Sequence, residues 1–406
     1  MNILFLTLSQ QFLHVEEPGI YTDLMKYFRD KGHNVYVVMP FERRFKKSTA
    51  LSVTCGFHIL GVKTLNIQKT NMIEKGLSYV LLERQFANGI RKYLKGIRFD
   101  VVLYSTPPIT LAKAVEFVKK RDGAKSYLML KDIFPQNAID IGLMSKNALW
   151  KFFLKKEQNL YQVSDYIGCM SPANVQYLIA HNPDYPADRV EVAPNSIALV
   201  EQTFEPGLQE AERRYIRGKY NLPADRPIFI YGGNLGKPQG VDYLVQCLDA
   251  NKHRQDCYFV IVGTGTDYYK IEDWMARQPA GHLNVRLMRW LPKEDYALLV
   301  RSCDVGLIFL DHRFTIPNFP SRLLPCLEYK MPVICATDPS TDMGRIAEEN
   351  GFGFWCESVR PEDFTRLVDK MLAADRKQMG ERGYQFLKDN YLVDHTYNAI
   401  MRHLHV

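Results

Sequence analysis

Residues 226–250 read RPIFIYGGNLGKPQGVDYLVQCLDA, and this stretch decides the fold class. An apolar segment typical of a buried strand (226–233) leads into a glycine-rich turn, and a segment with helical spacing of apolar residues (240–250) follows. A strand, a tight turn and a helix in this order form the repeating unit of a parallel sheet. The turn also favours an anion, because glycines let the backbone approach a phosphate and a helix N-terminus is partially positive.

The same alternation of strand and helix occupies the rest of the chain. Strand-like segments in the first half are 2–9, 33–40, 99–106, 124–132 and 164–171, and those in the second half are 226–233, 257–265, 285–292, 304–310, 331–337 and 352–356. This pattern predicts an α/β protein with two doubly wound, Rossmann-like domains that face each other across a cleft. We place the domains at 1–198 and 199–385, with a final helix in 386–406 that returns to the first domain.

Composition excludes several classes of protein. The 406 residues are 46% apolar and 24% charged, no run of about 20 apolar residues occurs, and the N-terminus reads as a strand rather than a leader. We therefore expect the protein on the cytoplasmic side, with attachment to the inner membrane as an option. The eight cysteines show no C-x-x-C pair, so we expect buried reduced thiols rather than a zinc site or disulfides. H-E-x-x-H and D-x-D are absent, and no metal is expected.

Charge is distributed unevenly between the two halves. Residues 1–195 contain 26 Lys and Arg against 17 Asp and Glu, whereas residues 196–406 contain 26 against 28. The first half is therefore expected to meet an anionic partner, a phospholipid surface or a diphosphate-linked substrate. No nucleic-acid recognition module is visible. Residues 80–97 mix apolar and basic residues at helical spacing, as an interfacial helix would, with an ordinary packed helix as the alternative.

Several strand ends in the second half carry residues suited to a nucleotide diphosphate. Two are glycine turns, a third is the sequence FTIPNFPSRLLPCLEYKMPVI (314–334), and a fourth is LMRWLPKED (287–295). In 314–334 we expect a helix that Asn318 caps and Pro320 begins, with Pro325 as an unexplained interruption. Trp290 is a candidate stacking platform, with burial in the core as the alternative. The candidate donor-binding residues from these turns are Gly233, Asn234, Lys237, Gln239, Gly240, Gly263, Gly265, Arg289, Trp290, Ser321 and Arg322.

The first half offers a different kind of chemistry. Lys131 and Asp132 follow an apolar strand, at the sheet edge where catalytic groups gather in doubly wound domains. We take both as catalytic candidates, and the alternative for Asp132 is a helix cap or loop anchor. The turn at 105–108 is expected to be structural.

Taken together, these motifs resemble a family 4 glycosyltransferase with the GT-B fold, of the type that builds bacterial surface polysaccharides. The resemblance rests on MNILFLT, FDVVLYSTPP, KDIFPQNAIDIGL, VAPNS, YGGNLGKPQGVDYL, FVIVGTG and PNFPSRLLPCLEYKMPVI, and it covers nearly the whole chain. It implies a retaining transferase that needs no cofactor or metal. The donor would be a nucleotide diphosphate sugar, with UDP favoured, bound to the second domain. The acceptor would be a saccharide carried on a polyprenyl diphosphate, bound to the first domain.

The resemblance also implies roles for individual residues. Gly19 would let the N-terminal loop approach the donor. Asn234 and Gln239 stand where the family has an arginine and a lysine on the diphosphate, so Lys237 would supply that charge. Arg322 matches a basic residue of a family subgroup that contacts the diphosphate. Lys131 and Asp132 stand where relatives carry a histidine near the acceptor.

One hallmark of the family is missing. The two glutamates of the Glu-x7-Glu pattern fall on Pro317 and Pro325, and the second normally holds the ribose. Glu328 is the candidate replacement, with an ordinary surface glutamate as the alternative. Two other functions therefore stay open: a nucleotide-sugar epimerase of the same fold, and a binding-only relative without activity.

Overall fold

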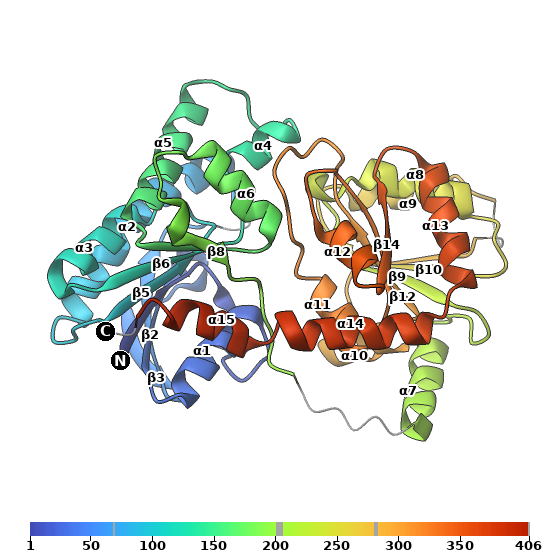
Figure 1. Cartoon of the computed structure of the whole chain (residues 1–406), viewed down its shortest axis with the longest axis horizontal. Helices are drawn as coiled ribbons and strands as arrows, with labels where there is room; N and C mark the ends of the chain where they lie inside the picture. The colour runs from blue at the N-terminus through green and yellow to red at the C-terminus, as the bar shows by residue number, and fades with distance from the viewer. Residues whose placement is uncertain (68–69, 200–205, 280–282, 405–406) are drawn as a thin grey trace. The chain divides into compact units, whose positions relative to one another are not determined.

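A computed structural model describes residues 1–67, 70–199, 206–279 and 283–404. The chain divides into two compact units, which we call the N-terminal unit (Met1–Ala198 with Tyr391–Val406) and the C-terminal unit (Leu199–Asn390). Figure 1 shows the chain coloured from one end to the other. Each unit contains its own sheet with helices on both faces, as the alternation of strands and helices predicts.

In the described part of the N-terminal unit, eight strands form one sheet in the order β3-β4-β2-β1-β5-β6-β7-β8. All neighbours are parallel except β3 and β4. The strands are β1 (Asn2–Leu6), β2 (Asn34–Glu42), β3 (Ala50–Thr54), β4 (Phe57–Thr64), β5 (Val101–Ser105), β6 (Lys125–Leu130), β7 (Tyr166–Cys169) and β8 (Val190–Val192). The order reverses direction at β1 and β5, so the loops after these strands flank the point where ligands bind in doubly wound sheets.

Helices cover both faces of this sheet. On one face, Tyr397 of α15 packs edge-on against Phe28 of α1, with 4.8 Å between ring centroids, so the last helix belongs to this core. Of the two alternatives for 80–97, the ordinary packed helix is the one that the structure supports for most of that stretch, because Leu82, Phe86 and Ile90 of α2 are fully buried. The helices are α1 (Ile20–Asp30), α2 (Met72–Tyr93), α3 (Ala112–Asp122), α4 (Gln136–Asp140), α5 (Ala148–Val163), α6 (Pro172–His181) and α15 (Val393–Met401).

The β3–β4 hairpin was not predicted. Its two-residue turn consists of Cys55 and Gly56, which both have positive φ, the geometry that matches the twist of a hairpin. Cys55 is exposed and the other seven cysteines are buried, all eight as free thiols. The prediction of buried thiols is therefore confirmed for all but Cys55.

In the described part of the C-terminal unit, six parallel strands follow the order β11-β10-β9-β12-β13-β14. This is the dinucleotide-fold order, and the direction reverses between β9 and β12. The strands are β9 (Ile228–Asn234), β10 (Tyr258–Thr264), β11 (Val285–Met288), β12 (Val305–Phe309), β13 (Val333–Thr337) and β14 (Gly353–Glu357). The glycine-rich turn that follows β9 therefore lies at the reversal point.

Figure 1 shows α8, α9 and α13 together over one face of this sheet. Elsewhere in the unit α7 packs against α10 and α11 against α14. The helices are α7 (Pro206–Lys219), α8 (Val241–Asn251), α9 (Tyr268–Ala276), α10 (Lys293–Ser302), α11 (Leu323–Glu328), α12 (Met343–Glu349), α13 (Pro361–Ala373) and α14 (Arg376–Asn390).

The helix in 314–334 begins later than predicted. The six-residue α11 starts at Leu323, and the backbone N–H of Asn318 donates to Thr341 Oγ1 instead of the Asn318 side chain capping a helix. Pro325 is thus the third helical residue, where a backbone N–H has no partner inside the helix in any case. The proline does not interrupt a helix: it stands in the first turn.

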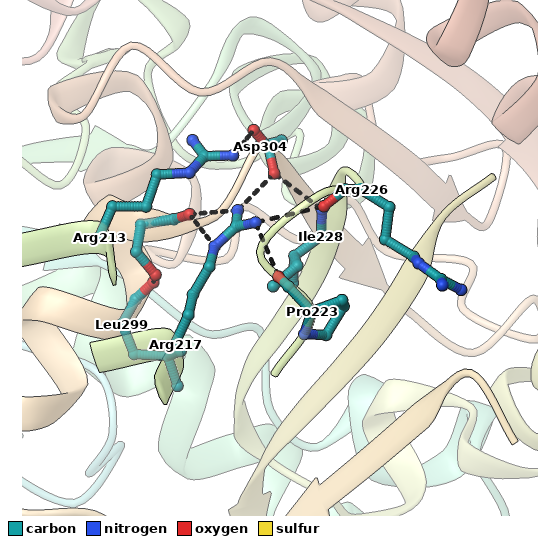
Figure 2. Close-up of polar contacts among 8 residues, drawn as sticks. Arg213, Arg217, Pro223, Arg226, Ile228, Leu299 and Asp304 are labelled. Carbon is teal, nitrogen blue, oxygen red and sulfur yellow. Dashed lines mark hydrogen bonds and ion pairs between the residues drawn. The ribbon is translucent and has the colours of Figure 1, made fainter. Parts of the chain in front are cut away.

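Arg217 of α7 is a buried arginine that connects this helix to the rest of the C-terminal unit (Figure 2). Its guanidinium donates twice to Ser302 O, once each to Pro223 O and Arg226 O, and once to Asp304 Oδ2 at 2.8 Å. A guanidinium has five N–H donors, so every donor is used.

Candidate functional site

The two glycine turns after β9 and β10 pack directly against each other. A Cβ atom on Gly263 would lie 1.9 Å from Gly233 O, and a Cβ on Gly265 would lie 2.2 Å from Leu235 O. Such distances are far below contact, so only glycine permits this approach of two backbones. The predicted residues Gly233, Gly263 and Gly265 are therefore brought together, and they have a structural reason to be glycine.

The turn after β9 is held by its own side chains. Asn234 Nδ2 donates to Gln239 Oε1 at 2.8 Å, and the Gly236 N–H donates to the same oxygen at 3.3 Å. Tyr231 Oη donates to Asn234 O at 2.6 Å. Asn234 and Gln239 thus contact each other, and the turn has a defined shape before any ligand arrives.

Arg322 joins this turn from a distant part of the sequence. Its Cζ lies 4.6 Å from the centroid of the Tyr231 ring, and a Cβ on Gly233 would lie 3.5 Å from the guanidinium. Nη1 of Arg322 is buried and has no hydrogen-bond partner among the described residues. Buried polar groups are rarely left unpaired, so this nitrogen is available to a partner from outside the described residues.

Lys237 and Gly240 belong to the same turn. They line a hollow of about 500 Å³ together with Lys270, Asp311 and Arg313, and Arg322 is not among the described residues that line it. Lys270 and Arg313 are paired with carboxylates there.

The remaining donor candidates are spread more widely. Trp290 is 75% exposed, so the alternative of a core tryptophan is excluded. Arg289 pairs with Glu272 at 3.1 Å and stacks on Tyr268, with its Cζ 4.3 Å from the ring centroid. Ser321 is exposed. Glu328 ends α11, six residues after Arg322, which separates the two along the helix by about 9 Å.

The N-terminal unit positions its candidates through Thr106. Thr106 Oγ1 accepts the backbone N–H of Lys131 at 2.9 Å and that of Asp132 at 3.0 Å, so the turn at 105–108 orients both residues. Lys131 Nζ donates to Ala193 O at 3.0 Å, and desolvation lowers its pKa to about 7. Gly19, in the loop after β1, precedes α1 in an extended conformation, and its N–H donates to Asp23 Oδ1 at 3.2 Å.

Asp132 has the chemistry of a proton acceptor. Desolvation raises the pKa of its carboxyl to about 6, although Asn137 Nδ2 donates to Oδ1 at 2.6 Å and favours the charged form. A carboxylate with a pKa near 6 is ionised at neutral pH and still basic enough to take a proton. Asn137 lies in α4, so Asp132 anchors that helix as well as offering a base.

Glu157 of α5 was missed by the sequence analysis. It is only 6% exposed and accepts a hydrogen bond from Tyr161 Oη at 2.7 Å. Burial is the main cause that raises its pKa to about 8, and the negative charge of Asp132 is a smaller cause in the same direction. A buried glutamate on a helix is not distinguishable from an exposed one by sequence pattern.

Glu157 predicts a pH dependence of stability. Because its pKa is higher in the folded protein than in the unfolded chain, its contribution is fully present below about pH 4.5 and is lost as the pH rises through about 8. The free energy of unfolding should fall in this window by up to about 1.4 kcal/mol per pH unit from this group. Glu157→Gln should flatten that slope in denaturation followed from pH 5 to pH 8, with Glu116→Gln, an exposed glutamate of α3, as control. Equal slopes would contradict the assignment.

Among the described residues, no group of three or more His, Cys, Asp or Glu side chains stands where it could hold a metal ion. In the same part of the chain, no helix is both long and apolar enough to cross a bilayer.

Two family models match the chain, one in each unit. The model described as glycosyltransferase family 4 matches residues 21–201, and the model described as glycosyl transferases group 1 matches residues 212–386. The fold, the glycine turns and these matches define a GT-B glycosyltransferase. The chain belongs to family 4 of these enzymes.

Individual relatives agree with this assignment. The probable glycosyltransferase WbjE of Pseudomonas aeruginosa is 22% identical over 331 residues, which cover 80% of this chain and 78% of the relative. The alpha-D-kanosaminyltransferase of Streptomyces kanamyceticus is 35% identical over 198 residues, 48% of each chain. Among solved structures, WaaG, a glycosyltransferase involved in lipopolysaccharide biosynthesis, has a TM-score of 0.65 at 12% identity, with 98% of this chain and 99% of WaaG covered. Anabaena HepE in complex with UDP also has a TM-score of 0.65, at 15% identity, with 100% and 99% covered.

Proposed function

We propose that the protein is a retaining, metal-independent transferase that moves a sugar from a nucleotide diphosphate, with UDP favoured, to a lipid-linked saccharide. The observation that carries this proposal is the guanidinium of Arg322, which lies against Gly233 at the end of β9 with a buried, unpaired Nη1. A diphosphate offers the charged oxygens that such a group binds most strongly. The HepE structure contains UDP, which supports this choice of nucleotide.

The reaction requires stabilisation of a leaving group. The acceptor hydroxyl oxygen forms a bond to the anomeric carbon while the bond from that carbon to the donor phosphate oxygen breaks, and the nucleoside diphosphate departs. Arg322 and the N–H groups of the β9 turn would bind the charge that grows on the diphosphate. The acceptor proton goes to a donor phosphate oxygen or to Asp132, whose raised pKa suits that role. Attack from the face of the leaving group gives retention.

The acceptor assignment rests on charge and on Lys131 and Asp132. The first half of the sequence carries the excess of positive charge, as a diphosphate-linked acceptor would require. Lys131 and Asp132 lie after β6, at the carboxyl edge of the sheet, where such folds bind ligands. We place the protein at the cytoplasmic face of the inner membrane, as a peripheral protein, because a polyprenyl-linked acceptor is embedded there.

One assay distinguishes the candidate functions. Release of nucleoside diphosphate from UDP, GDP, TDP and ADP sugars is measured with and without lipid-linked saccharide, and with and without EDTA. We expect turnover that depends on the acceptor, is fastest with a UDP sugar and is unaffected by EDTA. Conversion of the donor without acceptor would identify an epimerase. A thermal shift on adding a nucleotide sugar, without turnover, would identify a binding-only protein.

A further inference from the structure

A stretch after α4 presents apolar and basic side chains to solvent. Leu143 is 57% exposed, Leu149 is 53% exposed and Phe152 is 40% exposed, which is unusual for residues of this size. Three exposed lysines accompany them. We call this set the α4–α5 surface; it consists of Leu143, Lys146, Leu149, Lys151, Phe152 and Lys155.

The α4–α5 surface is held in place by hydrogen bonds. The backbone N–H of Leu143 donates to Ala138 O at 2.8 Å, which closes the turn after α4. Asn147 caps α5, because its Oδ1 accepts the N–H groups of Leu149 at 3.0 Å and Trp150 at 3.1 Å. The exposed apolar side chains are therefore part of a formed structure and not of a frayed end.

On α5 the apolar and basic residues share one exposed face. Leu149 and Phe152 are three residues apart, so they are neighbours on the helix surface, and Lys155 follows three residues after Phe152. The second half of α5 packs inward through Glu157, Leu160 and Tyr161, which are buried, so the exposed Leu, Phe and Lys side chains belong to its first half. Exposed Leu, Phe and Lys side chains on a helix that is anchored in its own fold suit an apolar, negatively charged surface.

The positive charge of the α4–α5 surface indicates which kind of partner binds there. Between Asp140 and Glu157 the sequence contains four lysines and no acidic residue. The fourth, Lys156, is paired with Glu83 of α2 at 2.8 Å, which leaves the three lysines of the α4–α5 surface exposed. A second copy of this chain on the same patch would bring like charges together, because a two-fold contact pairs a surface with itself. An anionic bilayer matches both the charge and the apolar residues.

We propose that the α4–α5 surface docks the protein onto a bilayer that contains anionic phospholipid. Asn137, at the start of α4, contacts Asp132, and the end of the same helix leads into the surface. Docking there would bring the candidate acceptor residue Asp132 to the interface in which a lipid-linked saccharide is held. This placement rests on the proposed function; bilayer docking itself does not require it.

The test measures co-sedimentation with vesicles of phosphatidylcholine and phosphatidylglycerol, and with vesicles of phosphatidylcholine alone. The wild-type chain should pellet with the first and not with the second, and high salt should release it. Replacing the three lysines by glutamine (K146Q, K151Q and K155Q) should weaken binding about 100-fold, since each basic residue near an anionic surface contributes about 1 kcal/mol. Leu149→Ser with Phe152→Ser should weaken it about tenfold or more.

A matched control replaces three exposed lysines of the same unit at the opposite, amino-terminal edge of the sheet: Lys31, Lys95 and Lys125, each to glutamine. This variant loses the same charge and should pellet like the wild type. Circular dichroism and melting temperature verify that every variant is folded. Equal loss of binding in control and test variants, or no binding by the wild type, would overturn the proposal. Dissociation of an oligomer by the α4–α5 substitutions, without any effect on vesicles, would identify an interface between copies instead.

Activity in solution separates this inference from the proposed function. With a water-soluble acceptor saccharide and no vesicles, the α4–α5 variants should turn over donor at the wild-type rate. If turnover depends on the acceptor but the chain does not bind vesicles, the docking proposal is refuted and the proposed function stands. Vesicle binding without turnover of any nucleotide sugar refutes the proposed function and leaves docking intact.

Discussion

Replacing Arg322 with alanine is expected to reduce kcat/KM for the nucleotide sugar at least tenfold, and about 100-fold if its charge acts mainly on the leaving group. The reason is geometric. The guanidinium lies over Tyr231 and beside Gly233, with Nη1 buried and unpaired among the described residues. Removing it would leave the diphosphate with backbone N–H donors but without the full positive charge.

The split between kcat and KM shows how Arg322 acts. An interaction that strengthens as the diphosphate departs lowers kcat, whereas equal contact with bound donor and transition state raises KM alone. Arg322→Lys should recover only part of the activity, because an ammonium cannot make the two parallel bonds of a guanidinium. The matched control is Arg345→Ala in the same unit, an exposed arginine whose nearest carboxylate is Glu349 at 3.8 Å, and it should behave like the wild type. Unchanged activity in Arg322→Ala would remove this residue from the site.

The stability of Arg322→Ala should move in the other direction. A buried guanidinium nitrogen without a partner is unfavourable in the folded state, so its loss should leave the melting temperature unchanged or raise it. A variant with unchanged stability but reduced turnover indicates that the replaced residue serves ligand binding and not folding. A large fall in melting temperature would instead assign Arg322 a structural role.

The fold could be predicted because the alternation of apolar and amphipathic segments recurs along the whole chain. The pattern could not predict local features such as a hairpin turn or the residue at which a helix begins. The β3–β4 hairpin turns through Cys55 and Gly56, which lack the Asn-Gly or Asp-Gly signature of such turns. In 314–334, Pro320 and Pro325 are both compatible with a first helical turn, and only the surrounding packing selects the later start at Leu323.

The candidate site was likewise predictable only in its local motifs, and not in the contacts between distant segments. Glycines at the ends of β9 and β10 follow from the strand–turn–helix pattern, but the contact between Gly233 and Gly263 depends on strand order. The position of Arg322 over Tyr231 joins segments far apart in sequence, so no local motif reports it. Lys237 looks equivalent to Arg322 in sequence, yet it lines a hollow whose described lining does not include Arg322. The burial of Glu157 follows from tertiary packing alone.

Replacing Arg217 with alanine is expected to destabilise the C-terminal unit by about 3–5 kcal/mol, the cost of breaking a buried ion pair and orphaning its partners. Asp304 would keep Arg213 and the Ile228 N–H as donors, but the carbonyls of Ser302, Pro223 and Arg226 would lose theirs (Figure 2). For a unit of this size the melting temperature should fall by about 10 °C. Thermal and urea denaturation measure the change.

Two further variants show which property of Arg217 matters. Arg217→Lys keeps the charge and should still lose most of the stability, because an ammonium cannot reach carbonyls on several sides at once. Arg213→Ala removes a partly exposed partner of the same Asp304 and should cost less than about 1 kcal/mol. Similar losses in Arg213→Ala and Arg217→Ala would contradict the account of a fully used guanidinium.

Arg217 should matter little for catalysis once the unit is folded. It contacts Asp304, just before β12, and Asp304 in turn accepts the N–H of Ile228 at the start of β9. The glycine turn and Arg322 lie instead at the carboxyl end of the sheet. At a temperature where Arg217→Ala is still folded, its kcat/KM should therefore stay within about threefold of the wild type, a free-energy difference under 1 kcal/mol. Arg322→Ala is expected to show the opposite pattern, with a normal melting temperature and poor turnover. If Arg217→Ala and Arg322→Ala each reduced both stability and turnover, the distinction between a structural role for Arg217 and a donor-binding role for Arg322 would be contradicted.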